Sequence, residues 1–136
     1  MPPGSLKDAA HAIDAQLRQC PIQTLVHGDA KVANFCFAAD AVAAVDFQYT
    51  GGGPGIVDVV YFLGSVLDDR ALYAEAEHWL DRYFARLASP DAEAAWRPLL
   101  PFAWADFERF LAGWSPGHWK RGGYAAEQTR IALQRL

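Results

Sequence analysis

The chain has 136 residues, of which 52% are hydrophobic and 21% are charged, so it has the size and composition of one globular domain. Its net charge of −4 and the lack of a basic cluster argue against a nucleic-acid partner. No apolar run reaches the roughly 18 residues of a membrane span, and no signal peptide opens the chain. With only Cys20 and Cys36, far apart, we expect a cytoplasmic protein with reduced thiols and no membrane partner.

The first third of the chain predicts one helix and then short strands. Residues 5–19 have helical apolar spacing, which Pro21 ends. Strand-like runs follow at 24–26, 35–37 and 41–45, and residues 38–40 are expected to turn a hairpin between the last two. The glycine-rich stretch 51–55 is expected to break regular structure as a flexible connection, because it fits neither phosphate-binding glycine motif.

The rest of the chain is predicted to be helical. Ser89 is a plausible helix cap with Pro90 at the first helical position, whereas Pro98 and Pro101 should kink or split the helix that follows. The expected helices cover residues 56–67 (apolar and buried), 71–87 (amphipathic), 90 onward, 102–111 and about 122–136. No alternation of strand and helix suggests a doubly wound sheet. The predicted class is therefore α+β, mainly α.

Many polar and aromatic residues of the helical part have ordinary structural explanations. We expect the aromatic side chains between Trp79 and Trp119 to lie mostly in the core. Asp106 and Glu108 fit a solvated helix face better than a site for a cationic substrate. These residues therefore contribute nothing to the functional hypothesis.

Three polar residues, Asp29, Asn34 and Asp46, lie where predicted strands meet loops. Asp29 precedes Asn34 by five positions, as in the H-R-D-x-x-x-x-N loop of protein kinases, and Asp46-Phe47-Gln48 follows where kinases have Asp-Phe-Gly. Phosphoryl transfer needs a carboxylate that orients a hydroxyl and accepts its proton, together with hard oxygen ligands for Mg²⁺. Asp29 would supply the first, and Asn34 and Asp46 the second.

The stretch HGDAKVANFCF, together with VDFQ and GGGPGIVDVVYFL, resembles the aminoglycoside phosphotransferase / choline kinase superfamily, most of all its ecdysteroid-kinase-like (CHK-kinase-like) branch. Gly28 stands where protein kinases have Arg, and Asp58 matches the Asp that opens a helix beneath the active site. The resemblance is specific over residues 25–63. It implies a phosphotransferase that moves the γ-phosphate of ATP, with Mg²⁺, to a hydroxyl of a small molecule.

By this resemblance the chain is a single kinase-like C-terminal lobe. Its catalytic and metal loops are expected at 25–58, with small β-hairpins around the catalytic loop, and its helical bundle at 56–136. Only 26 residues precede His27, so we expect the ATP-binding N-terminal lobe to be absent. Independent activity should then be weak or nil, since positioning supplies most of the catalysis in phosphoryl transfer.

The remaining residues of the motif have supporting roles or open ones. His27 is expected to tie the catalytic loop to the segment around Asp46, and Asp58 to accept hydrogen bonds from loop N–H groups. Lys31 has two interpretations that the sequence leaves open: a catalytic cation that neutralises the transferring phosphoryl group, or a solvated loop charge.

Other function classes remain beside the enzyme. A lone C-terminal lobe would expose apolar surface that normally packs against its partner lobe. The chain could thus be a catalytically silent binding module, a homodimer that covers its own cleft, or half of a split kinase whose N-terminal lobe is a separate polypeptide. The sequence does not identify the substrate.

Overall fold

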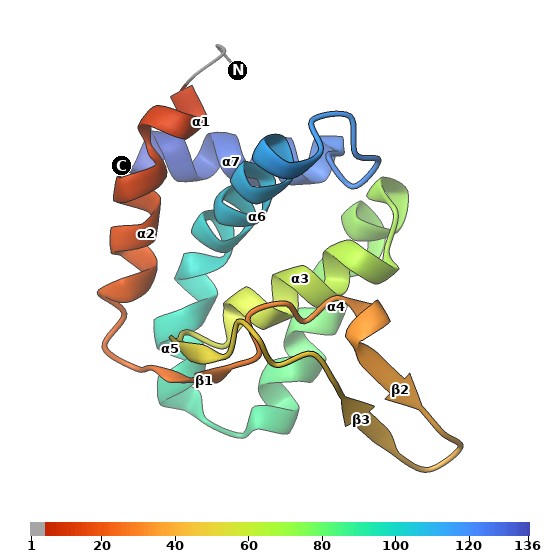
Figure 1. Ribbon diagram of the computed structural model, residues 1–136. Helices are drawn as coiled ribbons and strands as arrows, with labels where there is room; N and C mark the ends of the chain where they lie inside the picture. The colour runs from red at the N-terminus through yellow and green to blue at the C-terminus, as the bar shows by residue number, and fades with distance from the viewer. Residues whose placement is uncertain (1–4) are drawn as a thin grey trace.

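The computed structural model describes residues 5–136 and consists mainly of helices, with two small antiparallel sheets (Figure 1). The predicted class, α+β and mainly α, is confirmed. The elements in chain order are α1 Ser5–Asp8, α2 Ala10–Arg18, β1 Thr24–Val26, the 3-10 turn η1 Val32–Asn34, β2 Phe35–Phe37, β3 Val42–Ala44, β4 Gly51–Gly53, α3 Ile56–Val66, α4 Asp69–Leu87, α5 Pro90–Trp96, the 3-10 turn η2 Arg97–Leu99, α6 Leu100–Trp114 and α7 Gly123–Arg135.

The β2–β3 hairpin forms as the sequence predicts. Phe35 pairs with Ala44 and Phe37 with Val42, and the Ala38 N–H closes the turn on the Ala41 carbonyl at 2.8 Å. Figure 1 shows this hairpin projecting away from the helices. Two strands bury little of their own surface, so the hairpin relies on the chain around it for stability.

The glycine-rich stretch departs from the prediction. Gly51–Gly53 is strand β4 and pairs antiparallel with β1, with Val26 opposite Gly51 and Thr24 opposite Gly53. The prediction of an unstructured, flexible connection was therefore wrong. A ladder is made by backbone groups, so glycines can form one when a partner strand fixes their register. That partner lies about 25 positions upstream, beyond the reach of local pattern reasoning.

Local capping chemistry sets the ends of several helices. The Asp68 side chain accepts the Ala71 N–H and begins α4, and the Ser89 side chain accepts the Ala92 N–H and begins α5 before Pro90. The turn η2, which contains Pro98, separates α5 from α6, as predicted. These caps fix where α4 and α5 begin.

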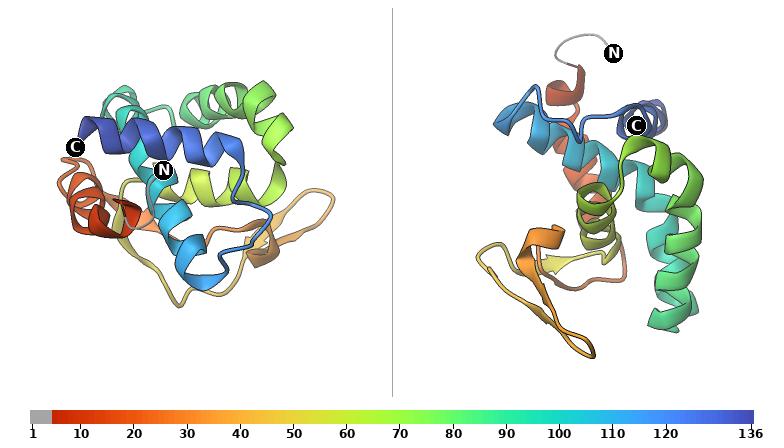
Figure 2. Two further views of the ribbon diagram at one scale, coloured as in Figure 1. Left: turned by 90° about the horizontal axis from the view of Figure 1, so that it is seen from above. Right: turned by 90° about the vertical axis from the view of Figure 1, so that its right-hand side faces the viewer.

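Helix α6 is at the centre of the core. It packs against α2, α3 and α7, and Trp104 and Ala105 on it are almost completely buried. Figure 2 shows α7 running across one side of α6, while in its right-hand view the strands lie on one side of α3 and α4 on the other. Other buried members of the core include Ile13, Ile56, Val60, Leu80, Phe84, Trp96 and Ala132.

Two expectations about burial need correction. Helix α3 buries only one face, through Ile56, Val60, Leu63 and Gly64, and its other face lines a cavity. Trp114 and Trp119 are exposed at 67% and 65%, because the chain leaves the core where α6 ends. None of the described helices is long and apolar enough to cross a bilayer.

Glu108 also differs from its expected place on a solvated helix face. It is buried in α6, and its Oε1 accepts from Arg121 Nε at 2.8 Å. Arg121 also donates to the Pro116 carbonyl. The sequence pattern missed this pair because Arg121 comes from the loop between α6 and α7, which folds back onto α6.

Candidate active site

Residues 27–34, the candidate catalytic segment that follows β1, are fixed to helix α3 by one carboxylate. Asp58, in the first turn of α3, accepts the His27 N–H on Oδ2 at 2.8 Å and the Gly28 N–H on Oδ1 at 3.0 Å. Charge-assisted bonds of this kind are roughly twice as strong as neutral ones. The single side chain thus sets where the segment after β1 turns away from the sheet.

Gly28 occupies a position that only glycine fits well. Its φ is +84°, in the left-handed region that disfavours side chains, and a Cβ built on it would lie 2.2 Å from the Tyr49 carbonyl oxygen. The side chain that protein kinases have here would collide with the segment after Asp46. Glycine is therefore part of the local architecture.

His27 joins the catalytic segment to the residues that follow β3 and precede Asp46. Its Nε2 lies 2.7 Å from the Val45 carbonyl, which can only accept, so Nε2 carries the proton. Its Nδ1 accepts the Asp29 N–H at 3.2 Å, which fits the same neutral tautomer. Val45 also donates its N–H to the Asn34 carbonyl at 2.9 Å.

Asp46 follows Val45 and therefore lies beside two anchored groups, His27 and Asn34. Its φ is +62°, a left-handed conformation that Asp tolerates better than most residues. Its side chain is exposed and makes no hydrogen bond or ion pair to other described residues. The backbone thus presents a free carboxylate next to the catalytic loop.

Asn34 and Lys31 both bind the carboxylate of Asp29. The Asn34 amide donates to Asp29 Oδ2 at 3.1 Å and to the Asp29 carbonyl at 2.8 Å. The Lys31 ammonium lies 3.2 Å from the same Oδ2. Asp29 Oδ1 has no bonded partner among residues 5–136. The structure therefore brings together Asp29, Lys31 and Asn34, as the loop spacing suggests.

The side-chain oxygens at this site suit a hard cation. Asn34 is buried, and its Oδ1 accepts no hydrogen bond from the described residues, while its amide nitrogen is fully used. The Asp46 carboxylate is free as well. Amide and carboxylate oxygens are ligands that Mg²⁺ accepts. Residues 5–136 hold no cluster of three or more His, Cys, Asp or Glu of metal-site type, so any ion would depend on these two oxygens and on ligands from outside.

Sequence reasoning missed one support of the site and one nearby cation. Ser65, in the last turn of α3, accepts the Val32 N–H at 2.8 Å and so holds the start of η1. Lys120, in the loop after α6, lies close enough to the catalytic loop that its pKa responds to it: burial and then the charge of Lys31 lower the pKa, and Asp29 raises it. Ser65 could have been singled out in the sequence as the lone Ser of an apolar helix, whereas nothing in the sequence distinguishes Lys120.

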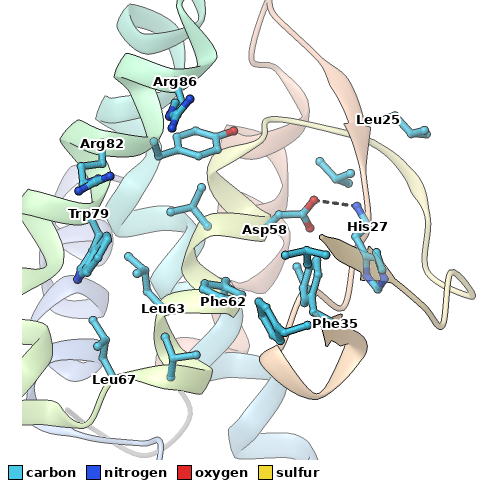
Figure 3. Close-up of a pocket in the computed structure, with 18 of the residues that line it drawn as sticks. Leu25, His27, Phe35, Asp58, Phe62, Leu63, Leu67, Trp79, Arg82 and Arg86 are labelled. Atoms are coloured by element: carbon cyan, nitrogen blue, oxygen red, sulfur yellow. Dashed lines mark hydrogen bonds between the residues drawn. The ribbon is translucent and has the colours of Figure 1, made fainter. Parts of the chain in front are cut away.

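A large apolar cavity lies behind the catalytic segment, between the hairpin, α3 and α4. Its volume is about 980 Å³, and it is lined by His27, Ala30 and Asp58 but not by Asp29, Asn34 or Asp46. Figure 3 shows Phe62 and Leu63 of α3 facing it, with the bond between Asp58 and the His27 backbone at its edge. We call this space the α3–α4 cavity.

Comparison with known proteins agrees with the motif. Neither the curated proteins nor the solved structures contain a match to this chain. Residues 6–93 match the ecdysteroid kinase-like family. This stretch covers well over half of the chain and includes the catalytic segment, the hairpin and helices α3 and α4. The chain therefore belongs to the ecdysteroid kinase-like family, whose members are kinase-like phosphotransferases.

Proposed function

We propose that this chain carries the catalytic lobe of an ATP- and Mg²⁺-dependent kinase that phosphorylates a hydroxyl group of a small molecule. One observation supports this most: a continuous hydrogen-bond network joins Asp29, Asn34 and the residue before Asp46. Loop Asp and Asn residues with ordinary turn-forming roles do not need to be linked to one another in this way.

Asp29 is the proposed base, and the geometry suggests which oxygen acts. The hydrogen bond from Asn34 and the ion pair with Lys31 both involve the same carboxylate oxygen of Asp29, Oδ2. Oδ1 is left to accept the proton of the attacking hydroxyl. At the same time the hydroxyl oxygen bonds to the γ-phosphorus of ATP, and ADP departs. The Lys31 side chain is 45% exposed, and the donor protons of its ammonium that do not face Asp29 Oδ2 can reach phosphoryl oxygens.

Asn34 and Asp46 are the proposed Mg²⁺ ligands. A bound Mg²⁺ would neutralise charge on the nucleotide phosphates. His27, Val45 and Asp58 would hold the two ligands in place through the bonds described above. We infer that residues 5–136 correspond to this lobe, with no second lobe among them to hold adenine, so we expect weak turnover unless another polypeptide or segment supplies it.

The metal site is tested by calorimetric titration with ATP, with and without Mg²⁺. Binding that needs Mg²⁺ and is lost in Asp46→Asn, but kept in Asp40→Asn, would support the assignment. Asp40 is a matched control because it is an exposed Asp in the hairpin turn. Equal loss in both variants, or binding independent of Mg²⁺, would count against Asp46 as a ligand.

The base is tested by turnover on a panel of small hydroxyl compounds. Asp29→Asn should abolish any phosphoryl transfer above background, because the amide cannot accept the proton. Its fold is checked by circular dichroism, since the bond from Asn34 to the backbone carbonyl of Asp29 survives the change. Full activity in Asp29→Asn would refute the assignment.

A second candidate function is a binding module without turnover. The α3–α4 cavity favours it, because exposed apolar residues such as Leu25 and Phe37 surround an open space large enough for a ligand or partner. Self-association is one form of this alternative and is measured by light scattering: a dimer would support it, whereas a monomer would exclude a second copy of the chain as the occupant of the cavity.

A further inference from the structure

The α3–α4 cavity has features of a ligand site that phosphoryl transfer does not use. Its volume of about 980 Å³ is at the upper end of the range for small-molecule sites. Its walls are mostly apolar, from Phe62, Leu63 and Val66 of α3 to Phe35 and Val42 of the hairpin. The proposed catalytic groups do not line the cavity, so a ligand here would occupy a separate site.

The charged side chains that line the cavity differ in whether they have a bonded partner. The Asp58 carboxylate is already satisfied by two backbone N–H groups. Arg82 and Arg86 line the opposite wall, one helical turn apart on α4, and neither has a carboxylate partner within residues 5–136. The Arg82 guanidinium lies over the Trp79 ring, 5.7 Å from its centroid. Figure 3 shows both guanidinium groups on the α4 side, with the apolar side chains below and opposite.

This arrangement defines the chemistry of an occupant. An apolar body would fill the space between α3 and the hairpin, and an anionic group would pair with Arg82 and Arg86. The nearby Tyr83 hydroxyl, whose pKa burial and then Asp58 raise, stays protonated and can donate as well. Because the whole chain carries a net charge of −4, general electrostatic attraction would not draw an anion here.

We propose that the α3–α4 cavity binds an anionic amphiphile, a molecule with an apolar body and a carboxylate, sulfate or phosphate head held by Arg82 and Arg86. This site lies behind the catalytic segment and does not depend on the phosphotransferase proposal. A partner helix or a second copy of the chain would need the same apolar walls, and the experiment separates these occupants.

The test is calorimetric titration of the full chain with decanoate and, as a probe of equal length and opposite charge, decyltrimethylammonium, both below their micelle concentrations. We expect one decanoate per chain and affinity for the cation lower by about tenfold or more. Arg82→Gln with Arg86→Gln should weaken decanoate binding about tenfold and remove the preference for the anion. Arg70→Gln, on the same helix but outside the cavity, should leave both affinities within about twofold.

A second variant tests the apolar wall. Val66 is 42% exposed at the end of α3, so Val66→Asp should leave the fold intact while its charge repels decanoate and abolishes binding. Absence of saturable decanoate binding, or equal binding of the anion and the cation, would overturn the proposal. A dimer in light scattering that dissociates in Val66→Asp would also overturn the proposal, because the second copy of the chain would then be the occupant.

Discussion

The two hydrogen bonds that Asp58 accepts from His27 and Gly28 can be weakened with almost no change of shape, by Asp58→Asn. Asn retains one carbonyl oxygen but replaces the other with an NH₂ group, which would face a backbone N–H. One of the two bonds, at 2.8 and 3.0 Å, is lost and the other becomes neutral. Hydrogen bonds to charged groups contribute about 1.5–3 kcal/mol, so we expect a loss of about 2–4 kcal/mol in the free energy of unfolding.

Urea denaturation measures this loss, with Asp14→Asn as the control. Asp14 pairs with Arg18 on the surface of α2, where the two side chains are 52% and 80% exposed, so its loss should cost less than about 0.5 kcal/mol. Hydrogen exchange of the His27 and Gly28 amides adds a local readout, because both should exchange faster in Asp58→Asn. Equal stability of the two variants and unchanged exchange would refute the reasoning.

Three further predictions concern the loops around the site. Gly28→Ala should destabilise the chain by about 2 kcal/mol or more in urea titrations. Gly52→Ala, whose added Cβ would meet no atom within 4 Å, should change stability by less than about 0.5 kcal/mol. Equal effects of the two variants would contradict the close approach of Gly28 to the Tyr49 carbonyl. Arg121→Gln should cost about 2–3 kcal/mol, because it leaves buried Glu108 without its cation, and an unchanged thermal midpoint would exclude this. Burial raises the pKa of Tyr124 to about 12, so the stability of the fold should decrease between about pH 10 and 12, where only the unfolded state loses the proton. Tyr124→Phe should flatten this decrease. An identical alkaline profile of the variant would show that Tyr124 does not cause it.

The sequence was sufficient for those parts of the molecule that local chemistry determines. The spacing of Asp29 and Asn34 predicted a catalytic loop, and the structure links the two through the Asn34 amide. Ser89 before Pro90 predicted the start of α5, because a cap and a fixed φ act within one helical turn. Such features depend on neighbours a few positions away, so one sequence contains them.

Features that depend on distant segments could not be predicted in this way. Strand β4 consists of glycines and exists because β1 pairs with it. The burial of Glu108 depends on Arg121, which a loop returns to α6. The cavity between the hairpin, α3 and α4 depends on where three elements lie in space. In each case the deciding contact joins segments whose spatial proximity no periodicity reveals.

The two faces of the catalytic segment are linked by the groups that hold it. On one face Asp29, Asn34 and Asp46 carry the proposed chemistry; on the other, His27 and Asp58 line the α3–α4 cavity. A molecule bound in the cavity would lie beside His27 and Asp58, so we expect its occupancy to influence the order of the catalytic loop. Because such coupling is reciprocal, an amphiphile that strengthens nucleotide binding would itself bind more tightly when nucleotide is present. The cavity therefore borders the bonds that hold the catalytic segment, although none of the proposed catalytic groups lines it.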